Sequence, residues 1–201
     1  MAINWIRTST AGSSSSVLQR RAYTCGYCDR SVGSDRGYYA TKGGSSSGNN
    51  LAGQICICPY CQSPTYFSEG GDQTPGSAFG GHVDHVASQE VENLYEEARN
   101  CMKVSAYTAA VMCCRKLLMN VAVSEGADEG KTFADYVRYL ADEGRIPPKA
   151  ETWVDHIRDK GNEANHEIQI MSRDDAERLV RFSEMLLRIM YEYPAEVAKP
   201  P

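Results

Sequence analysis

Two short cysteine pairs, Cys25-Gly-Tyr-Cys28 and Cys58-Pro-Tyr-Cys61, decide the fold of the first third of this 201-residue chain. Two residues separate the thiols within each pair, and 29 residues separate the pairs. A tight turn of this length aims two thiolates at one ion, and Gly26 and Pro59 suit such turns. We predict a zinc ribbon with one structural Zn²⁺ per chain and no open coordination position for a substrate. The predicted ligands are Cys25, Cys28, Cys58 and Cys61.

Four further cysteines and two histidines are weaker metal-ligand candidates. Cys56 lies two residues before Cys58, so it could substitute as a ligand, although packing is the better interpretation. Cysteine also behaves as a small apolar residue, and we assign the helical ones to the core or its edge. These are Cys101, Cys113 and Cys114. His82 and His85 have no further ligands nearby in the sequence, so we expect a solvated linker there.

Composition divides the chain into five segments. Residues 1–21 contain a serine run and predict a flexible arm, and residues 22–67 form the ribbon, with strands expected at 37–41 and 54–57. The Gly-rich residues 68–85 predict a linker. Residues 86–195 predict a helical domain, followed by a tail at 196–201.

Apolar residues recur at helical spacing after the linker, so we predict a mainly α chain behind a small β ribbon. The expected helices span residues 87–103, 105–124, 131–143, 148–166 and 173–193. Ser172 with Asp175 is typical of a helix N-terminus, and Pro194 is expected to end the fifth helix.

Charge and hydropathy limit the classes of function. The net charge is −5, which argues against a protein that coats nucleic acid non-specifically. Residues 86–201 hold fifteen basic and twenty-one acidic residues, so any polyanion site there must be local. The sequence shows neither a secretion signal nor an apolar run of about 20 residues, and CxxC pairs favour a reducing compartment. We therefore expect a cytoplasmic protein that does not enter a membrane.

The tyrosines of the ribbon have two interpretations. Beside a mildly basic strip, their rings could stack on nucleic-acid bases. Alternatively, they form the small core of a domain that has no other, which we slightly favour. The residues concerned are Tyr23, Tyr27, Tyr38, Tyr39 and Tyr60, with Arg20, Arg21, Arg30, Arg36 and Lys42 as the basic strip.

The fourth expected helix carries the densest polar stripe. Arg158, Asn162 and His166 fall on one helical face and are the candidate catalytic residues. His166 would act as general acid or base on a phosphodiester, and Arg158 would stabilise phosphate charge. In the structural alternative, His166 caps the end of the helix, and Arg158 and Asn162 contact Arg115 and Asn120 of the second expected helix. From the residues alone we favour this alternative.

Several runs of the helical part resemble a domain family of unknown function related to the HEPN (higher eukaryotes and prokaryotes nucleotide-binding) superfamily. That family also occurs behind zinc ribbons and fused to restriction-enzyme subunits. The similar runs are Tyr95-Glu-Glu-Ala98, Cys114-Arg-Lys-Leu-Leu118, Ile157-Arg-Asp-Lys-Gly-Asn162, Ala164-Asn-His166 and, in the ribbon, Ile57-Cys-Pro-Tyr-Cys-Gln-Ser-Pro-Thr-Tyr-Phe67.

This resemblance implies an up-and-down bundle of about five helices, a homodimer, and a link to nucleic acid or phage defence. Catalytic relatives are metal-independent ribonucleases that use an Arg and a His. Here seven residues separate Arg158 from His166, more than the family's catalytic motif has. We expect a dimeric module that binds RNA, DNA or a protein partner. A ribonuclease using His166 and Arg158, and a non-enzymatic oligomeric scaffold, are the alternatives.

Overall fold

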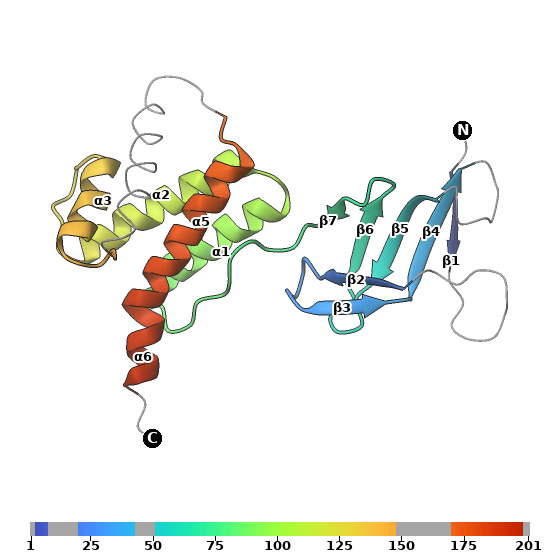
Figure 1. Cartoon of the computed structure of the whole chain (residues 1–201), viewed down its shortest axis with the longest axis horizontal. Helices are drawn as coiled ribbons and strands as arrows, with labels where there is room; N and C mark the ends of the chain where they lie inside the picture. The colour runs from blue at the N-terminus through green and yellow to red at the C-terminus, as the bar shows by residue number, and fades with distance from the viewer. Residues whose placement is uncertain (1–2, 8–19, 43–50, 148–169, 199–201) are drawn as a thin grey trace. The chain divides into compact units, whose positions relative to one another are not determined.

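The computed structural model describes residues 3–7, 20–42, 51–147 and 170–198 (Figure 1). The chain divides into two compact units, Met1–Ala78 and Phe79–Pro201. The first is built of strands and the second of helices, in the order that the sequence predicts.

Two antiparallel sheets form the first unit. The larger sheet has the strand order β1-β4-β5-β6-β7, and the smaller sheet pairs β2 with β3. The strands are β1 (Ile3–Arg7), β2 (Arg21–Thr24), β3 (Ser31–Ser34), β4 (Gly37–Lys42), β5 (Leu51–Ile57), β6 (Pro64–Ser68) and β7 (Gln73–Thr74). The two strands expected from the sequence correspond to β4 and β5.

A small core lies on one face of the larger sheet. Tyr39 of β4, Cys56 of β5 and Phe67 of β6 are buried there, because alternate residues of a strand point to the same face of a sheet. Tyr23 and Val32 of the β2–β3 hairpin pack against them, and the Tyr23 and Phe67 rings meet edge to face at 5.2 Å. The hairpin therefore covers this face of the sheet.

The second unit packs α2 against three other helices, α1, α3 and α5. Figure 1 shows α2 in yellow-green among them. The elements are α1 (Gln89–Lys103), α2 (Tyr107–Ser124), α3 (Phe133–Asp142), α5 (Arg173–Leu187), η3 (Arg188–Glu192) and α6 (Tyr193–Val197). Four of the five expected helices thus have counterparts. The fourth, at 148–166, lies outside the described residues.

The fold class is broader than we predicted from the sequence. The described residues combine two antiparallel sheets with helices, so the chain is a mixture of α and β rather than mainly α. A complete five-helix bundle is not found among the described residues. None of the described helices is long and apolar enough to cross a membrane.

Ordered structure extends into both segments that composition marked as an arm and a linker. β1 at 3–7 pairs with β4, with Arg7 opposite Tyr38. In the Gly-rich segment, β7 pairs with β6, and Val83 is buried in the core of the helical unit. Strand pairing and burial both depend on residues that are distant in the sequence, so local composition does not reveal them.

The helix ends follow local chemistry, with one exception. Ser172 and Asp175 form the expected capping box at the start of α5. Pro194, however, does not end the helical path, because α5 passes through the π turn η3 into α6. In that turn the Tyr193 N–H donates to the Arg188 carbonyl, five residues back. The wider turn relieves the clash that a proline ring makes with the preceding turn of an α-helix.

Candidate metal centre

Both cysteine pairs lie in turns of the same backbone design. In the first turn, the Cys25 N–H donates to the Arg30 carbonyl and the Asp29 N–H donates to the Cys25 carbonyl, both at 2.9 Å. The second turn repeats both bonds around Cys58 at 3.0 Å, with Ser63 and Gln62 as the partners. We call these two turns the knuckles. Their repetition indicates that they are two halves of one site.

The knuckles bring the four predicted ligands together. Their sulfur atoms all lie within 4.8 Å of one another, with Cys25 Sγ 3.7 Å from Cys61 Sγ and Cys28 Sγ 3.8 Å from Cys58 Sγ. Four thiolates around a zinc ion at about 2.3 Å would lie about 3.8 Å apart at the corners of a tetrahedron. The cluster therefore has the dimensions to hold a metal ion such as zinc.

The four thiols differ in exposure and in acidity. Cys25 and Cys58 are fully buried, whereas Cys61 is exposed. Burial raises the pKa of the Cys25 thiol to about 12, and hydrogen bonds from Ser63 lower the pKa of the Cys61 thiol to about 6. Zinc binds thiolates, so an ion that enters this site displaces the protons that the thiols still carry.

Gly26 in the first knuckle is required by a close backbone approach. A Cβ at this position would lie 2.3 Å from the Gly76 carbonyl oxygen and 2.7 Å from the Pro75 carbonyl oxygen. Since real Cβ atoms do not come so close, a side chain here would push the first knuckle away from residues 75–76.

The other cysteines lie outside the cluster. Cys56 is buried beside it, and no thiol beyond the four joins it among the described residues. Cys114 is fully buried in the helical core, and Cys101 and Cys113 pack at its edge, as expected. His82 and His85 take part in no metal-ligand group within the described ranges. The candidate catalytic residues Arg158, Asn162 and His166 lie outside the described residues.

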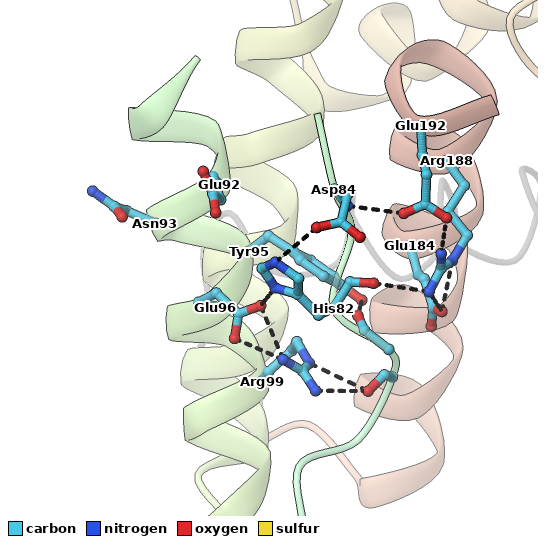
Figure 2. A network of polar contacts seen from close by, with 12 residues as sticks. His82, Asp84, Glu92, Asn93, Tyr95, Glu96, Arg99, Glu184, Arg188 and Glu192 are labelled. Atoms are coloured by element: carbon cyan, nitrogen blue, oxygen red, sulfur yellow. Dashed lines mark hydrogen bonds and ion pairs between the residues drawn. The ribbon is translucent and has the colours of Figure 1, made fainter. Parts of the chain in front are cut away.

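Sequence reasoning missed a polar network in the helical unit (Figure 2). Residues 79–84, which we call the strap, lie between α1 and α5, and Val83 is their buried anchor. Arg99 donates from Nε and Nη2 to the Gly80 carbonyl at 3.2 and 2.9 Å. Tyr95 Oη donates to the Gly81 carbonyl at 2.9 Å. Two residues of one helix thus hold consecutive carbonyls of the strap.

The opposite side of the strap is held by the last turns of the C-terminal helix. Arg188 donates to the His82 carbonyl at 2.9 Å, and Glu192 accepts from the Asp84 N–H at 2.8 Å. Arg188 also pairs with Glu184 and Glu192. Because these charged groups already bind the strap or one another, the network is part of the architecture rather than an open site.

Comparison with known proteins identifies one family. A family model described as "Domain of unknown function (DUF4145)" matches residues 96–199, which lie within the helical unit. No curated protein and no solved structure matches the chain.

Proposed function

The chain belongs to the family of the domain of unknown function DUF4145, and we propose that it is a zinc-stabilised module that binds nucleic acid through its ribbon. Cys25, Cys28, Cys58 and Cys61 would hold the ion. Four thiolates complete its coordination sphere, so the ion supplies folding energy and no position for a substrate. Free thiols that serve as ligands suit a reducing compartment, and we therefore place the protein in the cytoplasm.

The tyrosines of the ribbon carry this proposal. Only Tyr23 and Tyr39, each 9% exposed, serve the small core among the ribbon tyrosines described. The other four residues are exposed to larger fractions: Tyr27 54%, Tyr38 38%, Tyr60 61% and Tyr66 38%. These four side chains leave more apolar surface in water than core residues do, and bases stack on such rings at about 1–3 kcal/mol each.

Cationic groups accompany the exposed rings. The Arg30 guanidinium, which follows the first knuckle, lies 4.7 Å from the ring centre of Tyr60 in the second knuckle. Arginine that stacks on an aromatic ring keeps donors free for phosphate. The helical segment 86–201 has the opposite balance, fifteen basic and twenty-one acidic residues, which disfavours a polyanion there.

The helical domain supplies the remaining parts of the proposal. Its resemblance to HEPN proteins supports a homodimer and a role in phage defence. The ribonuclease alternative rests on Arg158, Asn162 and His166. Seven residues separate Arg158 from His166, more than the family's catalytic motif has, so binding is the function we propose first. A protein partner or a purely oligomeric scaffold are the outcomes to distinguish.

Binding of short labelled RNA and DNA oligonucleotides to the zinc-loaded protein tests the proposal. We expect binding at about 0.15 M salt that weakens as salt rises and is lost when a chelator removes the ion. If every oligonucleotide fails to bind the zinc-loaded protein, nucleic acid is not the ligand. RNA that stays intact in the same assay would argue against the ribonuclease alternative.

A further inference from the structure

The larger sheet of the ribbon has a second face. Tyr39, Cys56 and Phe67 lie on the face that the β2–β3 hairpin covers. Side chains alternate along a strand, so the residues between them point to the opposite face. Tyr38 and Tyr66 lie there and are half-exposed, with Ile55 of intermediate exposure.

Strand register aligns these three residues in one row. Tyr38 lies opposite Ile55, and Ile55 lies opposite Tyr66, across β4, β5 and β6. Directly opposed residues of antiparallel strands project on the same side, and neighbouring strands are about 4.8 Å apart. The two tyrosines are therefore about 10 Å apart on one surface with an apolar residue between them. We call Tyr38, Ile55 and Tyr66 the platform.

Gly53 lets one ring of the platform lie along the sheet. A Cβ on Gly53 would come within 2.9 Å of Tyr66 Cε2 and 3.0 Å of its hydroxyl. The Tyr66 ring thus lies over the glycine of the neighbouring strand. Tyr66 remains 38% exposed in this position, and an exposed aromatic ring can stack on a base.

The described positions of the cross-strand rows on this face include one basic residue, Arg36, and no acidic residue. Three cross-strand rows cover this face, and none of their described positions is Asp or Glu. The rows are Tyr38, Ile55, Tyr66 and Thr74; Ala40, Gly53 and Ser68; and Arg36, Ile57 and Pro64. Arg36 is exposed beside the platform, and Glu69, just beyond β6, is paired with Lys42 at 2.5 Å.

We propose that this sheet face is the place where the ribbon binds single-stranded nucleic acid, with bases stacked on Tyr38 and Tyr66 and the backbone beside Arg36. The inference rests on the proposed function and assigns its ligand and its surface. A duplex keeps its bases paired inside, so only unpaired bases reach rings that lie along a sheet.

The knuckle tyrosines are the natural comparison. Tyr27 and Tyr60 are more exposed than the platform rings, but they come from separate turns and no strand register aligns them. Arg30 lies over the Tyr60 ring and competes with a base for that face. We expect these residues to contribute less to stacking than the platform does, which makes them the variant to compare with it.

Fluorescence anisotropy of labelled oligothymidylate and oligouridylate, with the full-length zinc-loaded protein, tests the assignment. Tyr38→Ala and Tyr66→Ala should each weaken binding about tenfold, and the double variant about a hundredfold. Tyr38→Phe and Tyr66→Phe keep the rings and should retain affinity. The double variant Tyr27→Ala/Tyr60→Ala should weaken binding less than the double platform variant does, and a duplex should bind weakly. Zinc content of each variant verifies that the ribbon is folded.

The outcomes separate this inference from the proposed function. If the wild type binds and the knuckle variant loses affinity while the platform variants do not, the platform is wrong and the proposed function stands. If the Phe variants lose as much affinity as the Ala variants, stacking is wrong. If the wild type binds no oligonucleotide, the proposed function fails and the platform fails with it.

Discussion

The two units of this chain are stabilised in different ways. In the ribbon the buried apolar cluster of the described residues has seven members, and three of them are cysteines. In the helical unit the corresponding cluster has 24 members, among them Leu117, Leu140 and Phe182. A core as small as the first cannot offset the entropy of ordering its chain without a further constraint, whereas the second can. The ribbon should therefore depend on its metal ion, and the helical unit should not.

Loss of the ion should have the largest effect and should be confined to one unit. Cys58→Ser removes a fully buried thiol from the four-thiol cluster. Structural zinc sites contribute about 10–16 kcal/mol, so the ribbon should unfold while the helices persist. Zinc analysis should fall from one ion per chain to none. Amide NMR spectra should lose the dispersed signals of the strands and keep those of the helices.

Cys56→Ala is the matched control for this experiment. It removes a buried thiol from the same module but not from the four-thiol cluster, so zinc content should stay at one ion per chain. Loss of the ion in this variant would mean that Cys56 is a ligand. Loss of the helical signals in Cys58→Ser would show that the helical unit also depends on the metal, and the comparison would fail.

A core truncation in the helical unit should show the opposite pattern. Leu118 is fully buried, so Leu118→Ala should lower the free energy of unfolding of the helical unit by about 2–5 kcal/mol with zinc content unchanged. Met112 lies on the same helix with its side chain exposed, and Met112→Ala should change stability by about 0.5 kcal/mol or less. Chemical denaturation measures both, and equal effects would contradict the assigned core.

The knuckles were predictable from the sequence because their chemistry is local. A CxxC turn, with Gly26 or Pro59 inside it, specifies the positions of two sulfur atoms within four residues. The capping box of Ser172 and Asp175 is local in the same sense. The spacing of two such turns does not say where the strands pair, and β1 in particular has no signal of its own.

The strap and the platform were not predictable for the opposite reason. Arg188 and the His82 carbonyl are 106 residues apart in the sequence, and a side chain that binds a remote backbone group leaves no periodic pattern. The platform depends on the register between β4, β5 and β6. A shift of one residue would move Tyr38 into the covered face, and composition contains no information about register.

Removing the N-terminal cap of α3 should lower stability by a smaller amount, again in the helical unit alone. Thr132 accepts from the Asp135 N–H, and the Asp135 carboxylate accepts from the Thr132 N–H, at 3.2 Å in both cases. Thr132→Ala should therefore cost about 1 kcal/mol of unfolding free energy, whereas Thr132→Ser keeps the hydroxyl and most of the stability. Denaturation that detects no difference between the two variants would contradict the capping role of the hydroxyl.

A lower pH should stabilise the helical unit and destabilise the ribbon. The change in the helical unit is the smallest effect that we predict. His82 Nδ1 lies 2.9 Å from Glu96 Oε1, and its Nε2 lies 3.6 Å from Asp84 Oδ1. The hydrogen bond with Glu96, with the charges of Glu96, Asp84 and Glu92, raises the pKa of His82 above its ordinary value. The stabilisation is fully present below the unfolded pKa of about 6.5 and is lost as pH rises through the folded pKa.

Because His82 is half-exposed, solvent screening limits this contribution to about 0.5 kcal/mol. The helical unit should therefore be slightly more stable near pH 6 than near pH 8, within about that amount. The ribbon should show the reverse, since protons compete with zinc for the thiolates. His82→Gln should remove the dependence in the helical unit, measured by denaturation at both pH values, and leave acid release of zinc unchanged. If the slope of the helical unit persists in His82→Gln, another group titrates, and the strap does not account for it.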